Sequence, residues 1–277
     1  MLDKFIYENH LGQRFDGLKN GVYLNYSDLR DYSWNYDTMN SRISRFYRPI
    51  TNRKLPLVVV GKSNDEAVAV KNKLSELAEA DIEAMIPGKI FVGDYYTNGY
   101  ITASAKSEYL LTKRYSKIDL TLTSDDPAWY RERLHTFLPE SGSIVGVGEG
   151  TDYPYDYTYD YATISRSGKN IVCDSVRSNA FRLVIHGAVS NPSVTIGGHV
   201  YSINGTIGTG ETLLIDSLTK KITLTTVTGQ KINWFDKRSR DSYIFEPIPA
   251  GQHVVTWNGA FGFDLTVIEK RSEPRWT

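Results

Sequence analysis

Short apolar segments separated by turn-forming dipeptides fill the second half of the sequence. The turn signals are Ser167-Gly168, Asn191-Pro192, Gly197-Gly198, Asn204-Gly205 and Asn258-Gly259. The strand-like segments between them cover residues 181–186, 194–196, 200–203, 213–216, 221–226, 253–257 and 263–269. Short strands at this spacing are typical of an antiparallel β-sandwich or jelly roll. The sequence therefore predicts a β-sandwich in its C-terminal half.

The first half shows a similar strand pattern, interrupted by one helix. Apolar or alternating runs at residues 22–26, 43–47, 55–60, 89–96, 100–105 and 117–123 predict strands. Ser63 and Glu66 have the spacing of a helix capping box. The apolar stripe that follows consists of Ala67, Val70, Leu74, Leu77 and Ala78. This stripe predicts an amphipathic helix over residues 64–80.

A second helical signal begins at Asp126 and Pro127. An Asp N-cap with Pro at the first helical position favours a helical turn over residues 128–137. Glycines at positions 146, 148 and 150 then mark a flexible stretch. A chain of 277 residues is long enough for two domains. The predicted fold is mainly β with one helix in an N-terminal domain (1–137), a linker (138–152) and a C-terminal sandwich domain (153–277).

Composition excludes several classes of function. The 32 basic and 32 acidic residues cancel, so no overall field attracts the protein to nucleic acid or to a membrane surface. The single cysteine, Cys173, excludes an intrachain disulfide and fits assembly in a reducing cytoplasm. Residues 1–5 lack the pattern of an export signal, and no apolar run approaches a membrane span. We therefore expect a soluble protein without nucleic-acid or membrane partners.

Motifs for catalysis or metal binding are missing from the sequence. There is no Gly-x-Ser-x-Gly elbow, and the five histidines show no metal-ligand spacing. Gly146, Gly148 and Gly150 differ from a dinucleotide-binding loop in spacing. A pair of carboxylates from distant strands would leave no local motif, but nothing points to one. We predict no catalytic, cofactor-binding or metal-binding residues, and no enzyme activity.

The most distinctive segment is a run with tyrosine at every second position. Its rings are Tyr153, Tyr155, Tyr157, Tyr159 and Tyr161. In a strand they would share one face, which suits either stacking on a sugar or packing at a joint between domains or subunits. Packing is favoured because the run directly follows the glycine-rich stretch, whereas a binding platform belongs on a rigid sheet.

This run resembles the repeated aromatic-Pro-aromatic-Asp segment that opens the C-terminal domain in the distal tail (Dit) proteins of siphophages. Thr158 departs from the repeat, which would place a proline there. Further similar segments follow in the order of the family: Ser44-Arg45-Phe46-Tyr47-Arg48, residues 55–61, Pro87-Gly88-Lys89, Val92-Gly93-Asp94-Tyr95-Tyr96, Asp126-Pro127-Ala128-Trp129-Tyr130 and residues 266–276. The resemblance covers the whole chain.

The resemblance implies a structural hub at the tail tip of a virion, made and assembled in the host cytoplasm. It implies a homohexameric ring of N-terminal domains and a galectin-like C-terminal sandwich. The implied partners are other copies of the chain, the tail tube protein and the tail-associated tip protein, with tape measure and receptor-binding proteins as further partners.

The aromatic segment 30–40 is a candidate ring interface. Tyr32, Trp34 and Tyr36 suit a buried interface, but they suit the core of their own domain equally well. The alternative function is a carbohydrate-binding module, in which Trp234 and Trp257 would stack on saccharide. Near the C-terminus, Trp276 belongs either to a loose surface tail or to a tail anchored on a domain.

Overall fold

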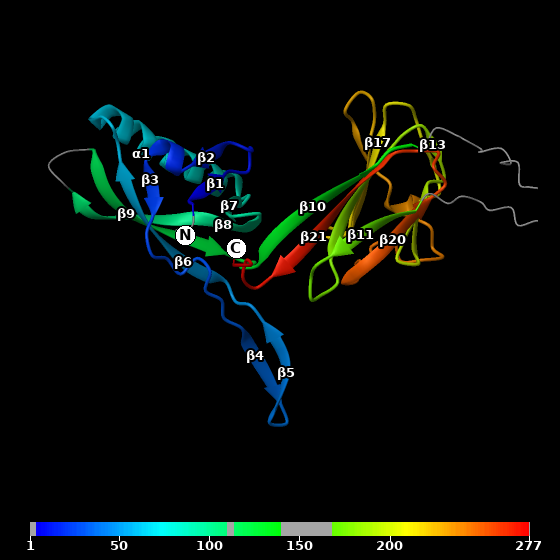
Figure 1. Ribbon diagram of the computed structural model, residues 1–277, viewed down its shortest axis with the longest axis horizontal. Coiled ribbons are helices and arrows are strands. Elements are labelled where there is room, and N and C mark those ends of the chain that lie inside the picture. The colour runs from blue at the N-terminus through cyan, green and yellow to red at the C-terminus, as the bar shows by residue number, and fades with distance from the viewer. Residues whose placement is uncertain (1–3, 110–113, 140–167, 277) are drawn as a thin grey trace, which may run out of the picture. The chain divides into compact units, whose positions relative to one another are not determined.

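The computed structural model describes residues 4–109, 114–139 and 168–276, and the chain forms two compact units (Figure 1). Unit 1 comprises residues 1–131 and 270–277, and unit 2 comprises residues 132–269. The units therefore divide before the predicted linker, most of which lies outside the described residues. The last residues return to unit 1 because two strands, β10 (Trp129–Phe137) and β21 (Phe263–Arg271), each continue from one unit into the other.

Unit 1 is one antiparallel strand path with a helix packed on it. Its elements are β1 (Ile6–Glu8), β2 (Arg14–Asp16), the 3-10 helix η1 (Leu18–Asn20), β3 (Val22–Leu24), β4 (Asn35–Met39), β5 (Arg42–Tyr47), β6 (Thr51–Val60), α1 (Asn64–Ala84), β7 (Gly88–Val92), β8 (Tyr95–Tyr109) and β9 (Tyr115–Ser124). The strands pair in the order β2-β1-β7-β8-β9-β6-β3. Two register shifts between β8 and β9 bend this path around its core.

The predicted helix is confirmed as α1, the only α-helix in the described part of the chain. Ser63 is its N-cap and accepts a hydrogen bond from the backbone N–H of Glu66. The predicted apolar stripe is buried and packs against β6 and β8. The helix continues to Ala84, four residues beyond the prediction, because a buried Asp81 adds a polar contact to the inward face.

The second predicted helical segment is wrong. Residues 129–137 form the strand β10. The cap signals are local, whereas a strand here pairs with β8, where Tyr130 lies opposite Tyr96, and with β21. The strand also buries Trp129 and Phe137 at its two ends. Tertiary pairing and burial therefore outweigh the local preference for a helical turn.

Unit 2 is a two-sheet antiparallel sandwich, as predicted. Its further elements are β11 (Gly168–Cys173), β12 (Ala180–His186), β13 (Val189–Ser190), β14 (Ser193–Ile196), β15 (His199–Ser202), β16 (Thr206–Ile207), β17 (Thr212–Asp216), β18 (Lys221–Thr225), β19 (Lys231–Asn233), the 3-10 helix η2 (Phe235–Lys237) and β20 (Gly251–Trp257). One sheet has the order β19-β18-β17-β12-β21-β10, and the other has the order β11-β20-β14-β15. A short pair, β13 and β16, completes the unit.

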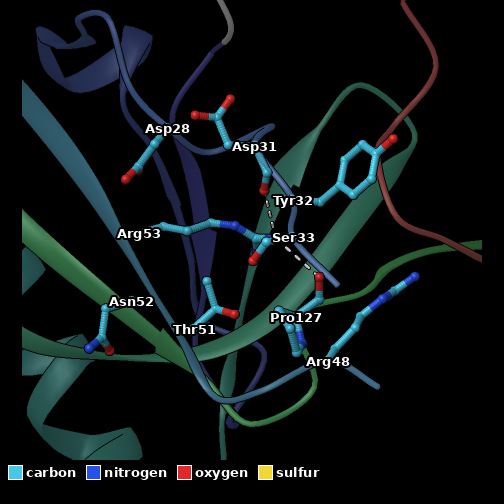
Figure 2. A pocket seen from close by; sticks show the side chains of 9 residues that line it. All are labelled: Asp28, Asp31, Tyr32, Ser33, Arg48, Thr51, Asn52, Arg53 and Pro127. Carbon is cyan, nitrogen blue, oxygen red and sulfur yellow. Dashed lines mark hydrogen bonds between the residues drawn. The ribbon is translucent and has the colours of Figure 1, made fainter. Parts of the chain in front are cut away.

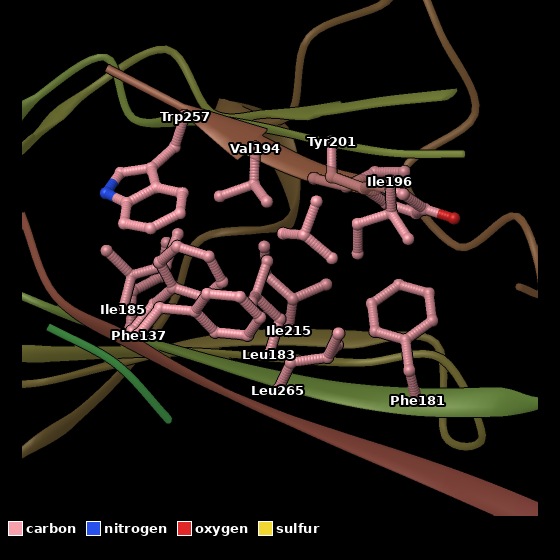
Figure 3. Packing of buried hydrophobic residues seen from close by; sticks show 14 of the residues in the cluster. Phe137, Phe181, Leu183, Ile185, Val194, Ile196, Tyr201, Ile215, Trp257 and Leu265 are labelled. Carbon is pink, nitrogen blue, oxygen red and sulfur yellow. The ribbon is translucent and has the colours of Figure 1, made fainter. Parts of the chain in front are cut away.

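The core of unit 2 consists of the inward side chains of both sheets (Figure 3). Every second residue of β12 and β17 points into it, which is the alternation expected of a strand with one buried face. The rings of Phe137 and Phe263 stack with centroids 4.5 Å apart, and Trp257 packs edge-on against both. Burial of this apolar surface is the main force that holds the sandwich together.

Candidate functional site

A hairpin formed by β4 and β5 projects from unit 1 (Figure 1). Every residue of both strands is solvent-exposed, although the hairpin carries large apolar side chains. Tyr36 and Phe46 are 57% and 58% exposed, and Met39 and Ile43 are equally open. A two-stranded hairpin without a packed face is marginally stable in water, and clustered exposed apolar residues mark interaction sites. The hairpin is therefore the strongest candidate interaction surface among the described residues.

Two turn residues explain why the chain reverses direction at this point of the sequence. Asn40 and Ser41 both adopt the left-handed conformation, with φ of 51° and 61°. Two such residues in succession form the turn type that matches the twist of paired strands, and Asn adopts this conformation readily. Tyr36 lies opposite Phe46, and their rings meet edge-on at 6.4 Å. The strand pattern predicts the second strand but not the hairpin, for which the turn residues Asn40 and Ser41 are the available signal.

The base of the hairpin contains a pocket of about 170 Å³ (Figure 2). It is lined by Asp28, Asp31, Tyr32, Ser33, Arg48, Thr51, Asn52, Arg53 and Pro127. Arg53 is only 2% exposed, and its Nη2 donates to the backbone carbonyls of Pro127 at 3.0 Å and Asp31 at 3.4 Å. Burial lowers the pKa of this guanidinium. Its Nε and Nη1 have no hydrogen-bond partner among the described residues.

Arg53 joins three segments that are distant in the sequence. Its own strand β6 follows the hairpin, Asp31 precedes the hairpin, and Pro127 precedes β10. The guanidinium also lies 5.9 Å from the ring centroid of the buried Trp129. The side chain therefore fastens the two ends of the hairpin to the body of unit 1, because one group satisfies carbonyls on both sides of the pocket.

Replacing Arg53 with Met is expected to lower the free energy of unfolding of unit 1. The substitution removes a buried cation but leaves the carbonyls of Asp31 and Pro127 without a donor, for a net loss of about 2 kcal/mol. Urea denaturation followed by circular dichroism measures the change. Lys54→Met, at the exposed neighbouring position of the same strand, is the control and should change stability little. Equal or greater stability of Arg53→Met would show that these hydrogen bonds are not needed.

The C-terminal residues are also fastened to the base of the hairpin. Arg48 donates to the Oγ of Ser272 at 2.8 Å and to the carbonyl of Arg271 at 3.4 Å. The guanidinium of Arg30 lies 4.1 Å from the ring centroid of Trp276. The C-terminal segment is therefore an anchored tail and not a loose one. Arg30, before the hairpin, and Arg48, after it, both contact the segment.

A carboxylate strengthens this attachment. Asp126 accepts hydrogen bonds from Lys270 and from the hydroxyl of Tyr130. Burial alone would raise the pKa of Asp126, but these hydrogen bonds and the charge of Lys270 lower it. The carboxylate therefore stays ionised at neutral pH and ties the start of the returning tail to unit 1.

The aromatic residues predicted for an interface do not fill the core of unit 1. The side chains of Tyr32 and Tyr36 are exposed, while Trp34 is half-buried beneath Arg48, whose guanidinium lies 4.3 Å from the indole centroid. All three lie in the hairpin or its base. Tyr153, Tyr155, Tyr157 and Tyr159 lie outside the described residues.

The two tryptophans predicted for saccharide stacking belong to the packing of unit 2. Trp257 is 4% exposed, and its Nε1 donates to the carbonyl of Phe261 at 3.1 Å. Its ring has no face open to a sugar, so it does not form a stacking platform in this fold. Trp234 is half-buried against the core and covers Gly205, where a Cβ would lie 3.0 Å from the indole ring. The strand pattern could not separate a buried from an exposed tryptophan.

The clearest cluster of titratable groups supports the fold. Asp81 is fully buried and accepts hydrogen bonds from the hydroxyl of Tyr7 and the backbone N–H of His10. Burial and the neighbouring carboxylate both raise the pKa of Tyr7. Gly88 is needed here, because a Cβ would lie 2.3 Å from Asp81 Oδ2. The cluster fastens the β1–β2 connection to α1, and its members are too far apart in the sequence to form a local motif.

Within the described ranges, no group of three or more His, Cys, Asp or Glu side chains could hold a metal ion. No described helix has the length and apolar character needed to cross a membrane. Cys173 is buried, and burial raises the pKa of its thiol, which is the opposite of what a reactive cysteine requires.

The two units together define a class of fold, a helix-bearing β unit with an antiparallel sandwich inserted near its C-terminus. No family model and no curated protein matches the sequence. Among solved structures, the chain is similar to the SPP1 Dit protein, described as a paradigm of the hub adsorption apparatus in phages that infect Gram-positive bacteria. The identity is 12% and the TM-score 0.55, and the match covers 96% of this chain and 99% of that protein.

The chain is also similar to a chain of the phage P2 baseplate in its activated conformation, in structures with Ca and with Sr. The identity is 12% and the TM-score 0.61 in both, and the match covers 99% of this chain and 100% of the other. At this identity the similarity is one of fold. It extends over at least 96% of every chain compared.

Proposed function

We propose that this chain is a structural distal tail (hub) protein of a bacteriophage, assembled as a homohexameric ring that links the tail tube to the tip. The observation that carries the proposal is the fold similarity to a phage hub protein and to a baseplate chain over essentially the whole chain. A similarity restricted to the sandwich would say little about function, because sandwich folds host many unrelated functions. Here the matched part of the chain includes both units.

The exposed hairpin supports self-assembly as part of this proposal. Its apolar side chains have no cover within the described part of unit 1. A closed ring of identical subunits needs two different complementary patches on each copy, so a projecting element with exposed apolar residues fits one of them. The role is geometric and requires no catalytic group.

The proposed partners follow from a position between tube and tip. They are further copies of this chain, the tail tube protein and the tail-associated tip protein, with tape measure and receptor-binding proteins as additional contacts. The proposed location is the tail tip of the virion, after assembly in the host cytoplasm.

The mass of the purified protein in solution tests the proposal. Light scattering coupled to size exclusion is expected to give six times the chain mass of 31.3 kDa. Negative-stain images of the same fraction should show rings with six-fold symmetry. A protein that stays monomeric at high concentration and in the presence of tail tube and tip proteins would contradict the ring.

A further inference from the structure

Two surfaces of unit 1 have opposite charge and exposed apolar residues. The first, the basic hairpin, consists of Tyr36, Met39, Arg42, Ile43, Arg45 and Phe46. The second, the acidic helix end, consists of Glu76, Glu79, Ile82, Glu83, Met85 and Ile86. We infer that the basic hairpin of one copy docks on the acidic helix end of the next copy. The inference rests on the proposed ring and names the surfaces that would close it.

The acidic helix end carries its charge on one side of α1. Glu76, Glu79 and Glu83 are spaced by three and four residues, which places them along one face of a helix, and all three are exposed. No basic residue occurs between positions 75 and 87. Beside these carboxylates, Ile82, Met85 and Ile86 are exposed as well. The patch therefore combines three exposed carboxylates with three exposed apolar side chains.

Two features of this patch work against the stability of the isolated helix. Carboxylates near a helix C-terminus interact unfavourably with the helix dipole, and the last turn of α1 contains Glu83 and no basic residue. Met85 then occupies the left-handed position after the helix, with φ of 54°, where glycine is strongly favoured. Its side chain is 79% exposed. A contact between these side chains and another molecule would offset both unfavourable features.

The basic hairpin complements this patch in charge and in apolar content. Arg42 and Arg45 outnumber the one acidic residue of the hairpin, Asp37. Within the described residues, neither arginine forms an ion pair, and the same holds for Glu79 and Glu83. Complementary charges at the border of an apolar contact set its register and exclude wrong partners.

The two surfaces cannot meet within one copy. The hairpin projects from unit 1 away from α1, and the two elements are well separated in Figure 1. A contact between them is therefore intermolecular and joins two different patches. Repeated from copy to copy, such a heterologous contact closes into a ring when the rotation between copies is suitable.

Charge reversal on each side tests the inference. One full-length variant carries Arg42→Glu and Arg45→Glu, and a second carries Glu79→Lys and Glu83→Lys. In each variant alone, the hairpin of one copy and the helix end of the next copy carry charge of the same sign. We therefore expect the concentration needed for assembly to rise about tenfold or more. An equimolar mixture should assemble again, because a negative hairpin meets a positive helix end and the reverse, giving an alternating ring of six.

A matched control reverses two exposed lysines of unit 1 outside both surfaces, Lys19→Glu and Lys62→Glu, and should assemble like the unaltered protein. Thermal unfolding by circular dichroism checks that each variant is folded. If the unaltered protein forms rings and the two variants also assemble normally, the inference is wrong while the proposed function stands. Loss of assembly that the mixture does not restore would also overturn it. A monomeric unaltered protein would instead contradict the proposed function.

Discussion

Shortening the hairpin is expected to convert the proposed ring into folded monomers. Tyr36 and Phe46 lie opposite each other, so a short glycine-rich turn can replace residues 37–45 and keep this pair. The change removes Met39, Arg42 and Ile43, none of which packs in the core of unit 1. The loss of assembly should therefore be complete in light scattering, while the unfolding temperature should remain that of the unaltered chain.

Single substitutions give the graded version of the same experiment. Ile43→Asp places a charge among the exposed apolar residues of the hairpin and should weaken assembly strongly. Val227→Asp makes the same change at an exposed position of unit 2 and serves as the control. Rings that persist after the hairpin is shortened would assign the interface to another surface. A lower unfolding temperature would indicate that the hairpin stabilises its own unit.

Replacing Trp257 with Ala is expected to destabilise unit 2 severely. The ring packs edge-on against the stacked rings of Phe137 and Phe263, and its N–H satisfies the buried carbonyl of Phe261. Loss of a buried tryptophan leaves a cavity and one unpaired carbonyl, which together cost about 3–5 kcal/mol. Chemical denaturation followed by tryptophan fluorescence and circular dichroism measures the loss in unfolding free energy.

Two matched variants separate the contributions of this residue. Trp257→Phe keeps most of the ring volume and loses the hydrogen bond, so its cost should be clearly smaller than that of the alanine variant. Trp234→Ala, at the half-buried position beside Gly205, should also cost less. If Trp257→Ala were fully stable and abolished binding to host cell-wall saccharide, Trp257 would be a binding residue rather than part of the core.

Local sequence signals predicted an element correctly where the tertiary contacts favour the same secondary structure. The helix α1 was predictable because its cap, Ser63, and its apolar stripe act within a few turns, and the packed sheet buries that stripe. The segment after Pro127 shows the opposite case, since its cap signals favour a helix but its neighbours in space are strands. Local preference is weaker than burial of Trp129 and pairing with β8.

The candidate surfaces were only partly predictable. The aromatic residues at 32, 34 and 36 stood out by composition, but the sequence could not separate a core from an interface. That distinction depends on whether another element covers the strand, and for β4 and β5 none does within the described residues. The acidic helix end was not predicted, because its carboxylates become a patch only once the rest of α1 is buried.

The sequence alone determined the features that depend on periodicity and turn chemistry. These are two β-rich parts, the helix α1, the sandwich, and the order of segments that resembles the distal tail proteins. The tertiary structure alone decided which side chains face solvent, as the buried Trp257 and the exposed Tyr36 show. It also decided that the tail beyond Glu269 returns to unit 1 through Arg48 and Arg30. The reason is that exposure and long-range contacts depend on which segments meet in space, and a single strand pattern does not encode its neighbours.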